Sequence, residues 1–198
     1  MHKGRLEAFS DGVIAVIITI MVLEIKAPEH ATLDALRPLA PELASYVVSF
    51  VVIAIYWNGH HHKLHVAKRI SAGVMWLNFH LLFWLSLIPV ATAWVGEHPE
   101  AAWPAALYGV VFLCAALAFN ALQRAIRTIH ADDEAIVGAL GRTTKGTIST
   151  LMYVAAIGLA FVHPWIADTL YVGVAVMWFV PDRGLERVAA KHERAEQP

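Results

Sequence analysis

The sequence predicts an all-α integral membrane protein with six transmembrane helices and both termini in the cytoplasm. Three observations predict this fold class. The 198 residues are 58% hydrophobic and 16% charged, whereas a soluble domain carries about 25% charged residues. Residues 74–94 and 101–123 contain no Asp, Glu, Lys or Arg, and each exceeds the roughly 18 residues that signal a membrane-spanning helix. The Lys and Arg residues gather in alternate connections between the apolar segments.

The first apolar segment is short and lies between charged residues. Residues 12–23 carry no charge, but Asp11 precedes them and Glu24 follows them, so the uncharged helix is only about 18 Å long. Lys3 and Arg5 give this region a superficial likeness to a secretion signal, but no small-residue cleavage site follows. We therefore expect a retained helix over residues 5–25, in an interior position where carboxylates are tolerated.

The remaining apolar segments predict five further helices. Trp76 and Trp94 bracket the third helix, and their separation of about 27 Å fits the hydrocarbon thickness with an aromatic residue at each interface. Asp168 leaves the sixth segment a short uncharged run. The expected helices cover residues 5–25, 43–65, 73–95, 101–128, 145–163 and 165–181. They form one transmembrane domain over residues 1–182, followed by a charged cytoplasmic tail over residues 183–198.

The positive charges orient these helices. Of the 15 Lys and Arg residues, all but Lys26 and Arg37 lie near the two termini or around the second and fourth connections. Cytoplasmic loops carry the excess of Lys and Arg. Both termini are therefore expected in the cytoplasm, in a multi-pass protein of the inner (plasma) membrane, which requires an even number of spans.

Helical periodicity sorts the first helix into faces. Phe9, Val16, Ile20 and Leu23 fall on one narrow apolar stripe with Thr19 at its edge, whereas Ser10 and Asp11 fall away from it. This stripe is either an ordinary packing surface or, if symmetry-related copies surround an axis, a hydrophobic constriction. Arg5 lies on the other side of the helix from Asp11 and cannot pair with it within one helix.

Two stretches of the sequence carry a resemblance to a known family. Residues 5–11 have the pattern R-x-x-x-F-S-D, and the segments Y-W-N-G-H-H at 56–61, W-L-N at 76–78 and L-I-P at 87–89 follow it. Over about the first 95 residues the chain resembles the endolysosomal potassium channel family of transmembrane protein 175, in its bacterial single-repeat form.

The resemblance implies a passive, potassium-permeable channel domain with six helices and a pore lined by the first helix. It implies a homotetramer in the lipid bilayer, because one repeat supplies one pore helix. It further implies a hydrophobic side-chain filter in place of a carbonyl filter, and the sequence has no T-V-G-Y-G run. The implied filter layers are Val16, Ile20 and Leu23, with Thr19 as a polar layer. Val16 is shorter than the Ile or Leu that the family most often carries.

The same resemblance implies roles for the motif. Arg5, Phe9, Ser10 and Asp11 are expected to position and gate the pore helix rather than to bind ions. Asn78 and His80 on the third helix are expected as partners of the motif.

The histidines and the carboxylates of the first helix suggest other functions. His60, His61 and His65 lie near one helix end, where His61 and His65 have a spacing suited to a metal, and His80 with Asp11 and Glu24 suggests a proton relay. A proton-coupled or metal-binding membrane transporter is therefore the alternative. No enzyme, cofactor or resident metal is expected, and the net charge of −1 argues against nucleic-acid binding.

Overall fold

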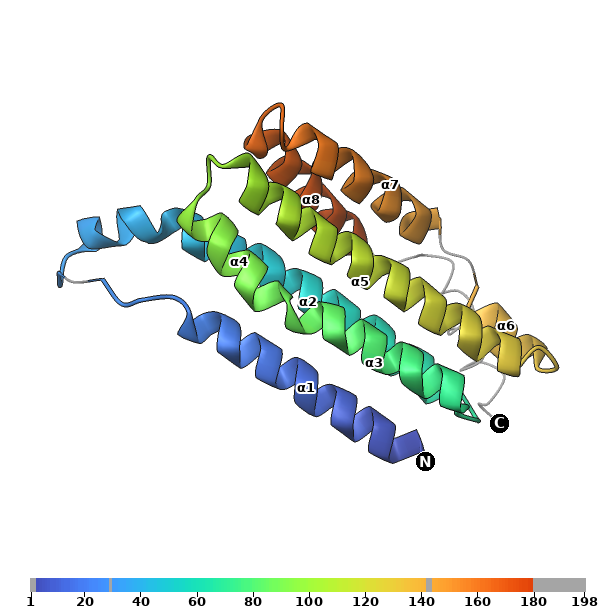
Figure 1. The fold of residues 1–198 in the computed structure, drawn as a ribbon. Coiled ribbons are helices and arrows are strands. Elements are labelled where there is room, and N and C mark those ends of the chain that lie inside the picture. The colour runs from blue at the N-terminus through green and yellow to red at the C-terminus, as the bar shows by residue number, and fades with distance from the viewer. Residues whose placement is uncertain (1–2, 29, 142–143, 180–198) are drawn as a thin grey trace, which may run out of the picture.

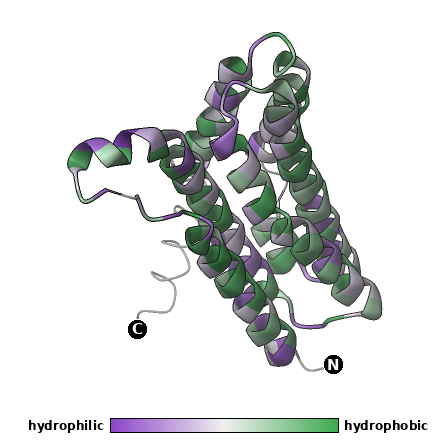
Figure 2. Cartoon of the chain, turned by 60° about the vertical axis from the view of Figure 1, so that its left-hand side comes forward, coloured by the Kyte–Doolittle hydropathy of each residue, from purple (hydrophilic) through white to green (hydrophobic). Residues whose placement is uncertain are grey.

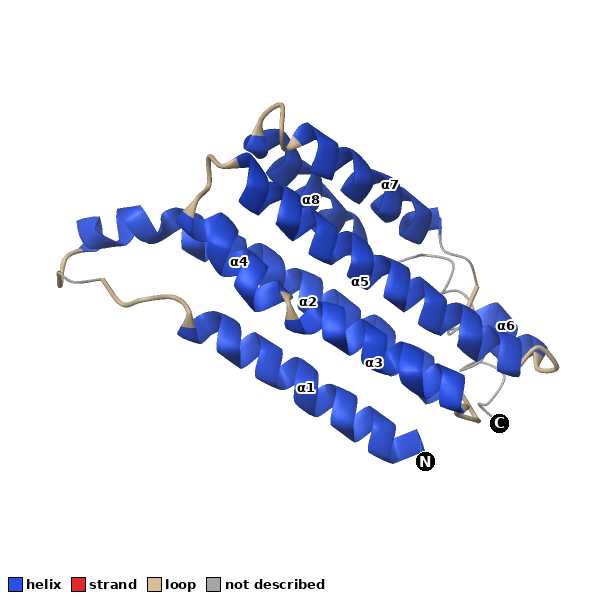
Figure 3. Ribbon diagram, in the orientation of Figure 1, coloured by secondary structure: helices blue, strands red, loops and turns tan. Residues whose placement is uncertain are grey.

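The computed structural model describes residues 3–28, 30–141 and 144–179, and these residues form helices joined by short loops (Figures 1 and 3). The elements are α1 (Lys3–Leu23), the 3₁₀ helix η1 (Leu33–Leu39), α2 (Ala40–Val66), α3 (Ala72–Ser86), α4 (Ile88–Glu97), α5 (Ala102–Ile129), α6 (Glu134–Ala139), α7 (Thr144–Leu159) and α8 (Pro164–Phe179). The all-α prediction is confirmed for the described residues. The predicted tail, 183–198, lies outside them.

Among the described residues, four segments are long and apolar enough to cross a membrane: Lys3–Leu23, Leu33–Val66, Ala72–Glu97 and Ala102–Ile129. Figure 2 shows hydrophobic residues along the lengths of the helices, with hydrophilic colour gathered in several of the connections. Helices α7 and α8 have 16 residues each, or about 24 Å of helix, which is shorter than the hydrocarbon core of about 30 Å. Six spans therefore remain a prediction, whereas the multi-pass membrane character is supported.

The predicted third helix, residues 73–95, corresponds to one candidate span, Ala72–Glu97, that is made of two helices. The chain bends at Leu87, which separates α3 from α4, and Pro89 occupies the first turn of α4. Proline has no backbone N–H, and its ring collides with the carbonyl four residues earlier in a continuous helix. The break at this point follows from the position of Pro89.

Helix α5 lies in the middle of the bundle, packed against α3, α4, α7 and α8, whereas α1 lies at an edge against α2, α3 and α4 (Figure 1). Aromatic rings fill the space between α5, α7 and α8. Tyr171 donates to the carbonyl of Ala105 at 2.9 Å, and its ring meets those of Tyr108 and Phe112 edge-on. This core holds the half of the bundle that lies away from α1.

Polar contacts tie two loops together at one end of the bundle. Lys68 Nζ lies 2.8 Å from Asp133, and Arg69 lies 3.1 Å from Asp132. The ring Nε2 of the buried His130 accepts hydrogen bonds from the backbone N–H groups of Lys68 and Arg69, each at 3.1 Å. Asp133 also begins α6 by accepting from the N–H of Ile136, as an N-terminal cap does.

Candidate pore helix and its anchors

Helix α1 has a buried face and an exposed face. The buried face packs against α2, α3 and α4. Its members recur every three or four positions, as one side of an α-helix requires. They are Leu6, Ser10, Ile14, Ile17 and Met21.

The predicted filter residues all lie off the buried face. Val16 is 54% exposed, Ile20 42% and Leu23 79%, and Thr19 is exposed beside them. The Thr19 hydroxyl donates to the carbonyl of Val16 at 2.8 Å, so its oxygen can still accept a hydrogen bond or contact a cation. Within one chain Val16, Ile20 and Leu23 are therefore not buried between helices. Large apolar side chains on one helix edge present a surface for lipid or for other copies of the chain.

Ser10 fixes the buried face of α1 to two other helices through a row of hydrogen bonds. The Asn78 amide Nδ2 on α3 donates to Ser10 Oγ at 2.9 Å, and Ser10 Oγ donates to the carbonyl of Leu6 at 2.8 Å. The Oδ1 atom of Asn78 lies 2.6 Å from His60 Nε2 on α2. Since an amide oxygen only accepts, His60 carries its proton on Nε2 and donates.

All three side chains of this row are buried, with exposed fractions of 1% or less. Buried polar groups are stabilising only when they are paired. The remaining ring nitrogen, His60 Nδ1, has no hydrogen-bond partner among the described residues. The row therefore depends on one rotamer of Asn78 and one tautomer of His60.

Asp11 makes a second connection between α1 and α2. Trp57 Nε1 donates to its carboxylate at 2.9 Å. The Trp57 ring stacks on His61 at a centroid distance of 5.8 Å, and His61 stacks on His65 at 6.0 Å. The carboxylate thus contacts one end of a ladder of rings on the exposed side of α2.

Phe9 and Arg5 have different surroundings. The Phe9 ring meets Phe79 of α3 edge-on at 5.7 Å, whereas Arg5 is exposed and has no ion pair among the described residues. Three of the four motif residues therefore contact α2 or α3. Trp57 and Phe79 were not predicted as partners, although Trp57 lies in the Y-W-N-G-H-H segment that had drawn attention.

The histidines do not form one site. His60 is buried against Asn78, His61 and His65 are exposed, and His62 faces a cavity on another side of α2. His80, expected beside the motif, accepts instead from Trp84 within its own helix at 3.3 Å. Among the described residues no group of three or more His, Cys, Asp and Glu side chains is placed to hold a metal ion.

Known proteins are similar to this chain in sequence and in fold. A family model described as endosomal/lysosomal potassium channel TMEM175 matches residues 5–89. The chain is 43% identical to a potassium channel of Chryseobacterium sp., over 94% of this chain and 97% of that protein. It is 37% identical to a potassium channel of Streptomyces collinus, over 81% of this chain and 84% of that protein.

A solved structure matches as well. The crystal structure of a lysosomal potassium-selective channel TMEM175 homolog from Chamaesiphon minutus superposes with a TM-score of 0.77 at 31% sequence identity. The superposition covers 89% of this chain and 95% of that chain. The similarity therefore extends well beyond residues 5–89, which the family model matches.

Proposed function

Because the chain belongs to the TMEM175 family of potassium channels, we propose that it is a potassium channel whose pore is lined by α1 from four identical copies. The family and the relatives named above are ion channels and not enzymes. The prediction of a non-enzymatic protein is confirmed by these comparisons.

The observation that carries the pore proposal is the division of α1 into two faces. Ser10, Asn78 and His60 bind one face to the rest of the chain, while Val16 and Leu23 point away from it. A single chain thus offers one apolar helix edge and cannot enclose an ion path. Copies related by an axis on the exposed side of α1 would enclose one, and we propose four of them, as the resemblance implies for a single-repeat chain.

The proposed constriction works by controlling hydration. From Val16 to Leu23 the helix rises about 10 Å, so the apolar neck is short. A bare cation in a dry apolar ring loses much of its hydration energy. Conduction therefore needs a ring wide enough for a partly hydrated ion, and a narrower ring closes by dewetting.

The hydration of the ions and the Thr19 oxygens both favour potassium modestly over sodium in the proposed neck. Potassium gives up water more readily than sodium, and the exposed Thr19 oxygens can replace part of the lost hydration. Val16 forms a wider layer than a longer Ile or Leu would. We therefore propose weak selectivity compared with a carbonyl filter.

The motif serves to hold the pore helix in place. Rotation of α1 about its axis would break the Asn78–Ser10 bond and the Trp57–Asp11 bond together. These contacts give α1 a preferred orientation, and gating in this proposal is a rotation of α1 out of that orientation. Arg5 is available for a contact with a neighbouring copy.

The proposed location is the inner membrane, with both termini cytoplasmic. The end of the bundle that carries Lys3, Lys68 and Arg69 is the cytoplasmic end under this assignment.

Flux and mass measurements test the proposal. Purified protein in proteoliposomes should carry potassium faster than sodium under equal gradients, and protein-free liposomes should carry neither. Native mass spectrometry should show four copies of the 21.8 kDa chain. Absence of cation flux from a protein that is verified as tetrameric would remove the channel assignment, and a smaller assembly with normal flux would remove the four-copy pore.

A further inference from the structure

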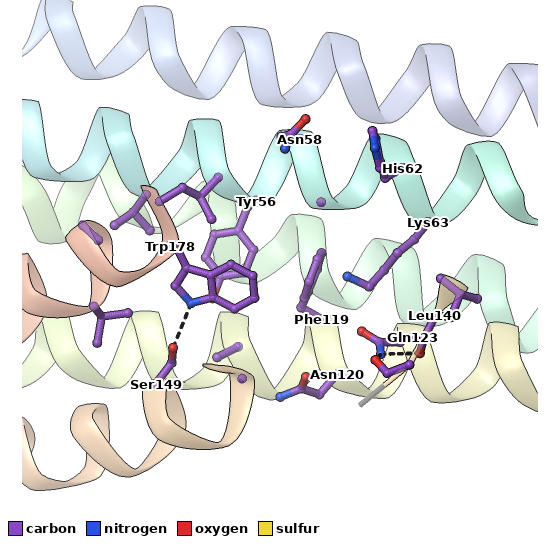
Figure 4. A pocket seen from close by; sticks show the side chains of 18 of the residues that line it. Tyr56, Asn58, His62, Lys63, Phe119, Asn120, Gln123, Leu140, Ser149 and Trp178 are labelled. Atoms are coloured by element: carbon purple, nitrogen blue, oxygen red, sulfur yellow. Dashed lines mark hydrogen bonds between the residues drawn. The ribbon is translucent and has the colours of Figure 1, made fainter. Parts of the chain in front are cut away.

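A second region of the chain carries features that the pore does not use. A cavity of about 550 Å³ lies between α2, α5, α7 and α8, with the end of α6 at one side (Figure 4). This volume falls within the range of about 300–1,000 Å³ that ligand pockets occupy. No residue of the proposed filter lines it.

Most of the cavity wall is apolar. Val52 and Ile55 of α2, Ala116 of α5, and Val174 and Ala175 of α8 contribute to it. Along α2 the lining residues run from Val52 to Val66, and the part between Val52 and Lys63 is about 16 Å long. That length corresponds to one leaflet of a hydrocarbon core about 30 Å thick.

Polar groups gather near one end of the cavity. Lys63 Nζ lies 3.5 Å from the centroid of the Phe119 ring, and Figure 4 shows its side chain directed toward Phe119 and Gln123. No carboxylate lines the cavity, and no described Asp or Glu forms an ion pair with Lys63. The lining side chains of Asn58 on α2 and Asn120 on α5 make no hydrogen bond to any described residue.

The cavity is held open by contacts around it. Gln123 Nε2 donates to the carbonyls of Leu140 and Gly141 at 2.8 and 3.0 Å, which fixes the end of α6. Trp178 Nε1 donates to Ser149 Oγ at 2.9 Å, which joins α8 to α7 (Figure 4). These hydrogen bonds between lining residues join the helices around the space.

We propose that this cavity binds an anionic membrane phospholipid, with its phosphate at Lys63 and one acyl chain along α2 toward Val52. The apolar length fits a single acyl chain of one leaflet, and the Lys63 ammonium, which has no described carboxylate partner, complements a negative headgroup. The Lys63 end is the one that carries Lys68 and Arg69. This is the predicted cytoplasmic side, where anionic lipids are concentrated and basic pockets between helices bind their headgroups.

Lipid retention by the purified full-length protein tests the site. Native mass spectrometry would compare phosphatidylglycerol with phosphatidylcholine of the same acyl chains, and with free oleate. The wild-type protein should retain phosphatidylglycerol. Lys63→Gln should lower that retention about fivefold and leave phosphatidylcholine unchanged. Ala175→Phe, which fills the apolar part, should lower retention without a change of charge.

A matched control separates the site from the general positive surface. Arg124 is exposed on α5, next to Gln123, and does not line the cavity, so Arg124→Gln removes the same charge nearby and should retain phosphatidylglycerol as the wild type does. Equal retention of the two phospholipids by the wild type would overturn the proposal, as would full retention by Lys63→Gln. Displacement of phosphatidylglycerol by an equal concentration of oleate would assign the cavity to a fatty acid and also overturn it. A wild-type protein that retains no lipid would also overturn the proposal, and the cavity would then be filled by another part of the chain or by a second copy.

Discussion

Asn78 and Ser10 lie 2.9 Å apart, and their hydrogen bond attaches the buried face of α1 to α3. The same Asn78 carboxamide contacts His60 on α2 at 2.6 Å, so one side chain joins three helices. The orientation of the proposed pore helix therefore depends on a polar contact in the protein interior rather than on apolar packing alone.

Removal of the Ser10 hydroxyl should destabilise the protein. Ser10→Ala leaves Asn78 Nδ2 buried without its acceptor, which costs about 1–3 kcal/mol. The free energy of unfolding, or the melting temperature in detergent, measures this loss. Ser86→Ala is the matched control, because the Ser86 hydroxyl is exposed and donates to the carbonyl of Phe83 within its own helix. Equal stability of the two variants would show that the Ser10–Asn78 bond is not an anchor.

Replacement of Trp57 by Phe should alter gating while the ring packing is largely kept. The substitution removes the indole N–H that donates to Asp11, so α1 loses one of the two hydrogen bonds that join its motif to α2 and α3. We expect the potassium flux in proteoliposomes to change severalfold at unchanged ion selectivity, because the neck residues are untouched. Trp76→Phe is the control, since Trp76 is 68% exposed and has no hydrogen bond among the described residues. Equal flux from Trp57→Phe and the wild type would contradict the role of Asp11.

Polar substitution within the stripe should change ion selectivity. Leu23→Asn introduces a polar amide into the proposed neck, which lowers the cost of partial dehydration for both ions and weakens the preference for potassium. Val22→Asn is the control, because Val22 is 47% exposed but lies outside the stripe at nearly the same height. The ratio of potassium to sodium flux is the measurement. The assignment of the stripe fails if both variants keep the wild-type ratio.

Lengthening Val16 should narrow the same neck. Val16→Ile adds one methylene to each copy at the proposed first layer, so dewetting becomes easier and the potassium flux should fall severalfold. The matched Val22→Ile variant should conduct as the wild type does. An unchanged flux in Val16→Ile would indicate that Val16 faces lipid or a neighbouring helix rather than the neck.

Acid should weaken the contact between the two connecting loops. The hydrogen bond from Lys68, followed by the one from the N–H of Ile136, holds the pKa of Asp133 below its ordinary value. A carboxyl group with a lowered pKa in the folded state stabilises the fold above its unfolded pKa of about 4, and this contribution is lost as the pH falls below that value. Asp133→Asn should therefore reduce the loss of melting temperature between about pH 5 and pH 3. An unchanged pH dependence in Asp133→Asn would show that another group governs the acid response.

The sequence predicted the helices well where a long uncharged apolar segment marks them. The long uncharged windows located α5 and the region of α3 and α4, because an apolar run of that length has few other structures available. The sequence did not predict the interruption of the third helix at Leu87. Pro89 breaks it, and a proline can kink a membrane helix or end it according to what the neighbouring helices satisfy.

The candidate site was only partly predictable. Periodicity placed Val16, Ile20 and Leu23 on one edge of α1, and it placed Ser10 off that edge. It could not identify Trp57 as the donor to Asp11, since 46 residues separate them in the chain. Nor could spacing show that His60 turns inward while His61 and His65 stay exposed; neighbouring positions on a helix differ by about 100°, and which direction is inward depends on α3.

The sequence by itself determined that this chain is a bundle of apolar helices, how those helices divide the charged residues, and which residues of α1 share an edge. These properties depend on composition and on the helical repeat, which act locally. Only the tertiary structure decided that this edge points away from the chain's own core, because that direction is set by Asn78 meeting Ser10 and by α2 meeting Asp11. Contacts between segments far apart in the chain have no local signal, and the cavity beside Lys63 exists only because four helices surround it.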